Sequence, residues 1–318
     1  MSRWDILDGS HDRYLDLPLE RSHHRDRGSG ADIPRGSRGS GSDRSRERKI
    51  DARDALVQQL DIPRSDVRQR VFVGDRSYPL RESEIRVLAT VGAFRVVDSR
   101  DLATGSADAR NGDLAHLREL KLIKVVGPQF RDGERAVAVT LTKEGRALLE
   151  RHQRTRDDEP RQAFYCEVAK PREMRHDAQL YRAYEEAAKR HQDRGDRIQR
   201  VVLDYELKRE YQRFLQAHNR GKRHSSGRPD RTPAEIAEWA REHGLPSDRR
   251  HVQFPDVRIE YERPDGRPAH EDIELATEHY NSRQMAGKRS SGFTICRGAS
   301  SHGSSSPFDP HPAERVLR

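Results

Sequence analysis

The pattern of apolar and polar positions predicts a run of helices, then a hairpin, then a longer mixed region. Three helices come first, over residues 83–92, 99–103 and 109–120, with apolar residues three or four positions apart. Ser83 and Ser99 are expected N-caps, because a serine hydroxyl can accept a hydrogen bond from a first-turn N–H. In the third helix, Leu114, Leu117 and Leu120 would form one buried stripe.

From residue 122 the pattern changes from the spacing of a helix to that of a β-strand, in which every second residue shares a face. Residues 122–126 and 136–141 are rich in β-branched residues and are separated by a Gly-Pro-Gln-Phe-Arg-Asp-Gly turn, so they predict a β-hairpin. Thr142 then begins another helix. Three helices, a two-stranded wing and a closing helix describe a winged helix-turn-helix, which we predict for residues 80–155.

This prediction is strengthened by two short runs, Leu117-Arg-Glu-Leu-Lys-Leu-Ile123 and Val139-Thr-Leu-Thr-Lys-Glu-Gly-Arg146, which resemble winged-helix transcription regulators. If the fold binds DNA, its third helix should enter the major groove and its wing should touch the backbone. The candidate contacts are Arg110, Asn111, His116 and Arg118 on the helix, with Gln129 and Arg131 at the wing tip. Acidic neighbours weaken the positive charge of that helix, so the alternative of an ordinary solvated face stays open.

Helical and strand patterns alternate after a polar break at residues 154–161. Strands are predicted at 164–168, 198–205, 252–262 and 271–277, and helices at 175–191, 206–217, 233–244 and from Ser282. We therefore predict a larger mixed α and β domain over residues 161–297. His176, at the start of its first helix, offers an additional acid or base, whereas Asp177 is explained by the positive end of the helix dipole.

Two carboxylates fall on one face of the last two predicted strands. Side chains alternate along a strand, so Val257 and Ile259 face away from Asp256, and parity places Glu274 beside Asp256 across the hairpin. Hard oxygen ligands suit Mg²⁺ or Mn²⁺, which makes Asp256 and Glu274 the predicted metal ligands. An ordinary hairpin with acids on its solvated face is the alternative.

The Pro255-Asp256 pair, followed by a strand with Glu274-Leu-Ala276, resembles the PD-(D/E)xK nucleases. The resemblance implies a restriction-endonuclease-like core in which two carboxylates hold a metal, the metal activates water, and a lysine assists. Ala276 occupies the usual position of that lysine. Lys288, from the following helix, is the candidate replacement, and a lysine on a merely solvated basic helix is the alternative.

A winged helix joined to such a core, with Asp272-Ile-Glu-Leu-Ala-Thr-Glu-His-Tyr280 and Ala286-Gly-Lys-Arg-x-x-Gly-Phe293, resembles the bacterial replication-relaxation family over residues 80–297. The resemblance implies a protein of plasmid or mobile-element replication and maintenance that binds double-stranded DNA. Replication or conjugation proteins would be further partners. A non-catalytic DNA-binding regulator, with the nuclease-like domain as an interaction platform, is the main alternative, and a protein–protein adaptor is a third.

The two ends of the chain differ from the rest in composition, because they are poor in apolar residues. Residues 1–50 are dense in Gly, Ser, Arg and Asp, and residues 298–318 are also of low complexity. Too few apolar residues occur in either segment to offset the entropy of ordering it, so both are predicted to be disordered arms. Residues 51–79 are left as a lead-in segment.

The chain has 318 residues and carries 61 Lys and Arg against 53 Asp and Glu, a net charge of +8 that agrees with a nucleic-acid partner. No apolar run approaches the roughly 18 residues of a membrane span, and the N-terminus lacks a secretory signal. Cys166 and Cys296 stand alone, which excludes a disulfide framework and a cysteine zinc site. We therefore expect a cytoplasmic protein without a membrane partner.

Overall fold

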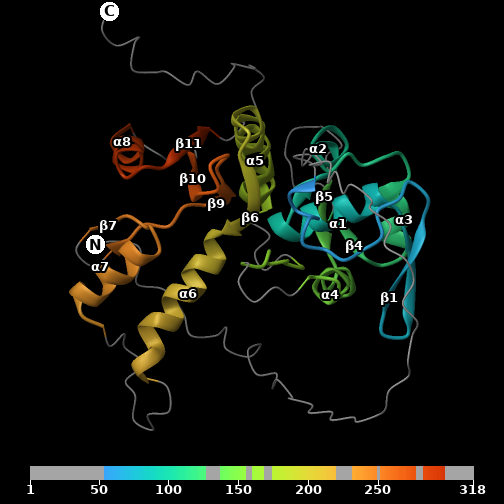
Figure 1. Ribbon diagram of the computed structural model, residues 1–318, viewed down its shortest axis with the longest axis horizontal. Coiled ribbons are helices and arrows are strands. Elements are labelled where there is room, and N and C mark those ends of the chain that lie inside the picture. The colour runs from blue at the N-terminus through green and yellow to red at the C-terminus, as the bar shows by residue number, and fades with distance from the viewer. Residues whose placement is uncertain are drawn as a thin grey trace, which may run out of the picture. The chain divides into compact units, whose positions relative to one another are not determined.

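The computed structural model describes residues 54–126, 137–154, 160–167, 174–219, 231–248, 251–276 and 282–297. All of them lie in one compact unit, Lys49–Arg318. They form a mixed α and β structure with several small sheets (Figure 1). The two predicted arms and the wing-tip residues Gln129 and Arg131 lie outside the described residues.

The first half of the unit begins with a β-hairpin, which precedes a set of short helices around a three-stranded sheet. The hairpin pairs β1 (Gln69–Val73) with β2 (Arg76–Leu80). The helices are α1 (Glu82–Phe94), α2 (Ser99–Thr104), α3 (Asp113–Glu119) and α4 (Lys143–Arg151). The sheet has the order β3-β5-β4 and is formed by β3 (Val97–Asp98), β4 (Ile123–Val126) and β5 (Ala138–Leu141), all antiparallel.

The predicted helices and the hairpin around residues 122–141 are present, but two predicted N-caps are wrong. Helix α1 begins one residue before Ser83, and its capping N–H, that of Arg81, donates to the carboxylate of Glu84 at 3.0 Å. Helix α2 begins at Ser99, and its N-cap is Asp98, whose carboxylate accepts a first-turn N–H at 2.9 Å. In α2 a carboxylate takes the role expected of a hydroxyl, whereas in α1 a carboxylate inside the first turn accepts the N–H of the N-cap residue.

The second half of the unit is a four-stranded sheet with helices on both sides. Its strands are β6 (Arg197–Leu203), β9 (Val257–Glu262), β10 (Pro268–Ala276) and β11 (Thr294–Arg297), in the order β11-β10-β9-β6. Strand β9 is antiparallel to both neighbours, whereas β11 is parallel to β10. The helices are α5 (Met174–Arg194), α6 (Asp204–Gln216), α7 (Pro233–Glu242) and α8 (Ser282–Ser290). A 3₁₀ turn (Ala217–Asn219) and the small strands β7 (Ser247–Asp248) and β8 (His251–Val252) complete it.

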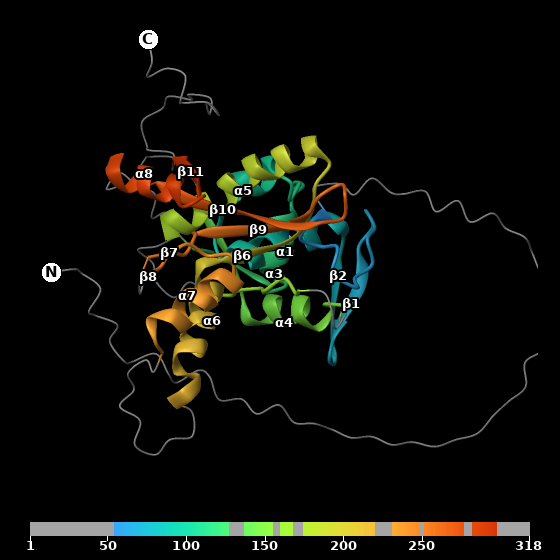
Figure 2. The ribbon, with the colours of Figure 1, turned by 60° about the vertical axis from the view of Figure 1, so that its left-hand side comes forward.

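Helix α5 lies on one side of β9 and β10, and α6 and α7 lie on the other (Figure 2). On the α5 side, the apolar side chains of the strands belong to a core that also includes the first-half helices. The ring of Phe94 in α1 lies 5.3 Å from Tyr181 and 5.1 Å from Tyr184, both in α5. The two halves of the unit are therefore joined by one continuous apolar core.

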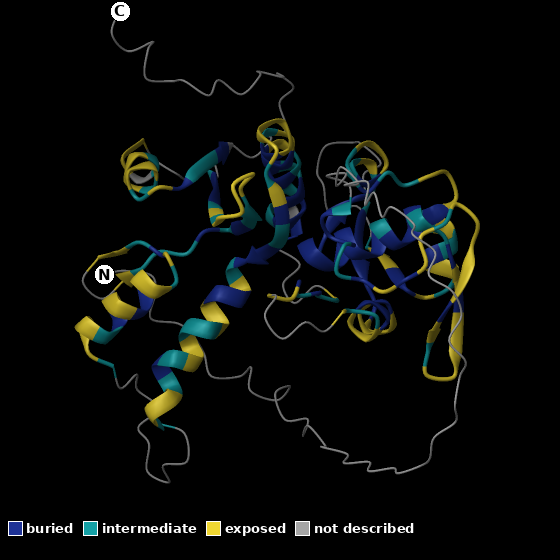
Figure 3. Ribbon diagram, viewed as in Figure 1, coloured by how far each residue is buried: buried dark blue, intermediate teal, exposed yellow. Residues whose placement is uncertain are grey.

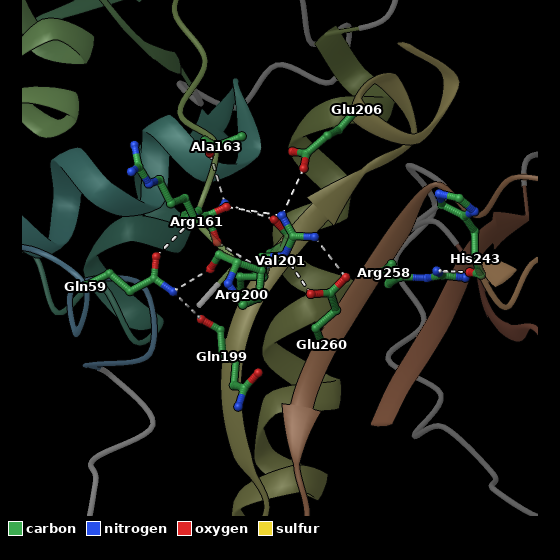
Figure 4. A network of polar contacts seen from close by, with 12 residues as sticks. Gln59, Arg161, Ala163, Gln199, Arg200, Val201, Glu206, His243, Arg258 and Glu260 are labelled. Carbon is green, nitrogen blue, oxygen red and sulfur yellow. Dashed lines mark hydrogen bonds and ion pairs between the residues drawn. The ribbon is translucent and has the colours of Figure 1, made fainter. Parts of the chain in front are cut away.

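The opposite face of the sheet carries charged residues that are buried or half-buried rather than solvated. Arg200 donates to the carboxylate of Glu260 at 2.6 Å and to that of Glu206 at 3.0 Å (Figure 4). Arg258 and Asp272 form a second pair at 2.7 Å and are only 5% and 7% exposed. The polar face expected from strand alternation is thus covered, because α6 and α7 pack over it.

The strand predicted at residues 164–168 is wrong for its described part, because residues 164–167 form no strand. The preceding residue Gln162 instead occupies the outer edge of β6. Its side-chain oxygen accepts the N–H of Val201 at 2.8 Å, and its side-chain nitrogen donates to the carbonyl of Val201 at 2.9 Å. At Val201, this buried amide therefore replaces the hydrogen bonds of a neighbouring strand, and Gln58 and Gln59 bond other carbonyls of the same edge.

Candidate functional site

Asp256 is fixed by hydrogen bonds at the point where the central strand β9 begins. Its N–H donates to the carbonyl of Ile273 at 3.0 Å, and its own carbonyl accepts the N–H of Asp204 at 3.2 Å. Its carboxylate accepts the N–H of Leu275 at 2.8 Å. Strand β10 and the start of α6 therefore hold Asp256, and its carboxylate lies against the Glu274–Leu275 peptide of β10.

Glu274 belongs to the same end of the sheet. Ile273 pairs with Val257, so the next position along β10 places Glu274 beside Asp256. Glu274 is 3% exposed, and its Oε1 lies 3.1 Å from the Nζ of Lys288. The structure thus brings all three predicted catalytic residues to one end of the sheet.

Lys288 reaches this site from α8, the helix between β10 and β11. Its ammonium lies 3.5 Å from the carbonyl oxygen of Phe254 and 4.7 Å from the centre of the Phe293 ring. These contacts, together with Glu274, hold the ammonium in place at the end of a flexible side chain. The side chain is 21% exposed, so the ammonium is close to solvent.

His176 of α5 also belongs to the site. Its Nε2 lies 3.5 Å from the carboxylate of Asp256, and its Nδ1 lies 3.7 Å from that of Asp177. The neighbouring carboxylates of Asp177 and then Asp256 raise the pKa of His176 to about 10, although burial opposes the shift. The imidazole is therefore positively charged at neutral pH and partly balances Asp256.

A strained turn at the end of α1 connects to this cluster. Arg95 has φ 65° and ψ −50°, and the N–H of Val96 donates to the carbonyl of Phe94 at 2.7 Å, which makes a γ-turn of the rare strained type. The Arg95 guanidinium lies 3.5 Å from Asp177, the carboxylate that contacts His176. Charges of alternating sign therefore run from α1 to Asp256.

The two carboxylates are a suitable donor set for a hard divalent ion. Within the part of the chain that the structure describes, no three His, Cys, Asp or Glu side chains gather as a metal cage. Mg²⁺ is commonly held by only one or two carboxylates, with waters and substrate phosphates completing its six ligands. Asp256 and Glu274 fit that requirement, whereas a structural zinc site would need four protein ligands.

Three of the predicted DNA contacts lie on the surface at α3 or just before it. Arg110 and Asn111 precede the helix and are exposed, and Arg118 is exposed in its last turn. Arg110 forms an ion pair with Asp66 at 2.5 Å, with its side chain 45% exposed. The three side chains are accessible to a polyanion, although Arg110 would have to exchange a carboxylate for a phosphate.

His116 is different, because its ring is turned towards the protein. Its Nδ1 lies 2.8 Å from the carboxylate of Glu84, which is fully buried in α1. The same carboxylate accepts hydrogen bonds from Arg68. His116 therefore ties α3 to α1, a role that helical spacing alone does not reveal.

Comparison with protein-family models, with curated proteins and with solved structures finds no match to this chain. None of the helices in the described ranges is both long enough and apolar enough to cross a membrane.

Proposed function

We propose that this chain is a DNA-binding protein of plasmid or mobile-element replication or maintenance, with a Mg²⁺- or Mn²⁺-dependent DNA nuclease or nickase in residues 161–297. The convergence of Asp256, Glu274 and Lys288 at one end of the sheet carries the nuclease part of the proposal. The biological setting rests on the family resemblance of the sequence.

The residues of the site divide the proposed chemistry between them. A bound Mg²⁺ or Mn²⁺ would supply an activated water and stabilise charge on the phosphate. Asp256 and Glu274 would hold the ion, and the N–H of Leu275 keeps the Asp256 carboxylate aimed at it. Lys288, 3.1 Å from Glu274, is close enough to donate to a phosphate oxygen as negative charge develops there.

The position of Lys288 answers the main objection from the sequence. Ala276 stands where the lysine of a PD-(D/E)xK site is expected, so the motif is incomplete on its strand. Helix α8 nevertheless brings the ammonium of Lys288 to 3.1 Å from a carboxylate oxygen of Glu274. This supports a functional replacement of the lysine by a residue of the following helix.

DNA binding is supported by the arrangement of the first half. Helix α3 directly precedes the antiparallel pair of β4 and β5, as the recognition helix precedes the wing in a winged helix-turn-helix. The exposed side chains of Arg110, Asn111 and Arg118 would then face the major groove or its flanking phosphates. The salt-sensitive affinity expected of such contacts is a direct test.

One observation favours the alternative of a non-catalytic regulator. Asp256 already faces His176, and Glu274 already faces Lys288, so each carboxylate has a cationic partner without a metal. A site balanced in this way can be a structural ion-pair cluster. The nuclease-like sheet would then serve as an interaction platform.

Plasmid nicking separates the two functions. Supercoiled plasmid is incubated with Mg²⁺ or Mn²⁺ and the wild type, Asp256→Asn, Glu274→Gln or Lys288→Ala. The matched control is Asp265→Asn, an exposed carboxylate in the turn between β9 and β10. We expect nicking by the wild type and the control and loss of nicking in the other three. No nicking by the wild type with either metal, or equal nicking by every variant, would refute the nuclease.

Two binding measurements test the rest of the proposal. Calorimetric titration with Mn²⁺ should show a site in the wild type that Asp256→Asn weakens and Asp265→Asn retains. Affinity for duplex DNA should fall steeply with salt, and Arg118→Ala should weaken it and reduce the salt slope by about 1. A salt-insensitive affinity, or none, would contradict DNA binding.

A further inference from the structure

The hairpin of β1 and β2 presents an exposed aromatic and basic face. Val71 and Tyr78 are paired in the register and buried on its inner face, whereas Phe72 is 58% exposed on the outer face. Arg70 shares the outer face with Phe72, and Arg76 is exposed at the tip. Most of the hairpin is exposed in Figure 3. A phenylalanine in this position contributes nothing to the core.

Exposed apolar side chains of this size are uncommon elsewhere in the described residues. The large hydrophobic residues found exposed are Val67, Phe72, Val125 and Tyr205. Two of these four lie within or directly before the hairpin. Phe72, exposed on a strand that also carries the exposed Arg70, is therefore a candidate contact residue.

Ion pairs tie both ends of the hairpin to α3, to the segment just before it and to α1. Before β1, Asp66 pairs with Arg110, and Arg68 shares the buried carboxylate of Glu84 with the α3 histidine. After β2, the Nε of Arg81 donates at 2.8 Å to Asp113, a fully buried residue of α3. The base of the hairpin is therefore held in a fixed position beside α3.

The other side of β1 is held as well. A ring nitrogen of His152, directly after α4, lies 2.8 Å from the carbonyl oxygen of Phe72. The hairpin is thus fastened beside α3 at its base and, at Phe72, to the residue that follows α4. Because the backbone is held in this way, the Phe72 ring is presented outward from a constrained strand.

The length of the hairpin suits an arm that follows DNA past one groove. Each strand has five residues, so the tip lies about 15 Å from the base at roughly 3.3 Å per residue. The major groove is about 12 Å wide. With α3 in that groove, an arm of this length is long enough to span the distance to the adjoining minor groove.

We propose that the hairpin is a second DNA-contact element, which enters the minor groove next to the groove occupied by α3. Arg70 and Arg76 contact phosphates, and Phe72 packs against sugars or wedges at a base step, as apolar side chains of minor-groove proteins do. The positive charge of the arm matches a duplex, since Asp75 in the turn is its only acid. This inference rests on the proposed DNA binding by α3.

Fluorescence anisotropy with a short labelled duplex tests the hairpin. The variants are Phe72→Ala and Arg70→Ala, both on an exposed face, so the core is unchanged. The matched controls are Tyr205→Ala, an aromatic residue 52% exposed at the start of α6, and Arg267→Ala, an arginine side chain 79% exposed in the β9–β10 turn. Thermal melts verify that all four variants are folded.

We expect Phe72→Ala to bind about tenfold more weakly with an unchanged salt slope, the size of effect seen when one base–aromatic contact is removed. Arg70→Ala should weaken binding and reduce the salt slope by about 1. Duplex binding by the wild type, with both variants equal to their controls, would overturn the hairpin proposal. Absence of any wild-type duplex binding would instead refute the proposed function. A wild-type preference for single strands, with Phe72→Ala weakened only there, would overturn the minor-groove contact.

Discussion

Removing the charge of Asp272 should destabilise the fold strongly, because it would leave a buried arginine without its counter-ion. The carboxylate accepts hydrogen bonds from the Nε of Arg258 at 2.7 Å and from one of its terminal nitrogens at 2.8 Å. The same guanidinium donates to the carbonyls of His243 at 2.6 Å and Gly244 at 3.1 Å, where α7 ends. One side chain therefore joins β9, β10 and α7, and its contact with His243 is drawn in Figure 4.

The size of the stability loss follows from the burial of the two side chains. Arg258 is 5% and Asp272 is 7% exposed, so solvent cannot compensate a lost partner. Breaking a buried pair from one side costs about 3–5 kcal/mol. For a folded unit of this size, each kcal/mol lowers the melting temperature by roughly 2–4 °C, which gives about 6–20 °C for Asp272→Asn.

Urea unfolding followed by circular dichroism measures the effect. The control is Asp265→Asn, whose pair with Arg267 is solvent-exposed and should be worth less than about 1 kcal/mol. The double variant Arg258→Met/Asp272→Leu should lose less stability than Asp272→Asn, because no unpaired charge remains. A loss below about 1 kcal/mol for Asp272→Asn would refute the assignment of this pair as a buried joint.

Three further predictions concern packing, the sheet edge and acid stability. Gly145→Ala should lower the melting temperature, since an added Cβ would lie 2.1 Å from the carbonyl oxygen of Leu122, and overpacking costs about 1–3 kcal/mol or more. Gln162→Leu should speed hydrogen exchange at the Val201 amide and destabilise the fold by about 1–3 kcal/mol for each buried group left unpaired. Glu271→Gln should reduce the stability of the fold at neutral pH and reduce it least in acid. Burial alone raises the pKa of Glu271, but hydrogen bonds from neighbouring histidine, arginine and threonine side chains lower it to about 2. The wild-type advantage is therefore full above the ordinary value of 4.5 and disappears as pH falls towards 2, as unfolding curves between pH 2 and 7 would show.

Local periodicity was sufficient to predict most helices and the strands around Asp256 and Glu274. The hairpin of β1 and β2 lies in residues 51–79, for which no strand is predicted. Its signal was present: Gly74-Asp75 forms a two-residue turn between strand-forming residues, and Gly74 has φ 56°. Exposed Phe72 obscured the alternation, since an apolar residue on the outer face breaks the expected pattern.

The burial of the charged sheet face could not be predicted from the strands themselves. Alternation assigns Arg258 and Asp272 to one face but does not say whether that face meets water. The covering helices α6 and α7 lie between β6 and β9 in the chain, and their docking depends on tertiary packing. A buried ion pair and a solvated one therefore have the same sequence pattern.

In the candidate site, too, some residues can be placed from neighbouring strands and others only from the tertiary structure. Parity and register bring Asp256 and Glu274 to one end of the sheet, which depends only on two adjacent strands. His176 and Arg95 come from α5 and α1, far away in the chain, so no spacing rule could place them there. The sequence indicated His176 as a possible acid or base, but not its contact with Asp256.

The contacts of α1 with α5 bear on how the two proposed activities would work together. Phe94 packs on two tyrosines of α5, and the next residue, Arg95, contacts Asp177 beside the candidate site. Helix α1 also holds α3 through the buried carboxylate of Glu84. The proposed recognition helix and the proposed catalytic residues therefore belong to one packed core, in which neither can move without disturbing the other. A protein built in this way would act on DNA at a set distance from the groove that α3 occupies, rather than searching with a tethered catalytic domain.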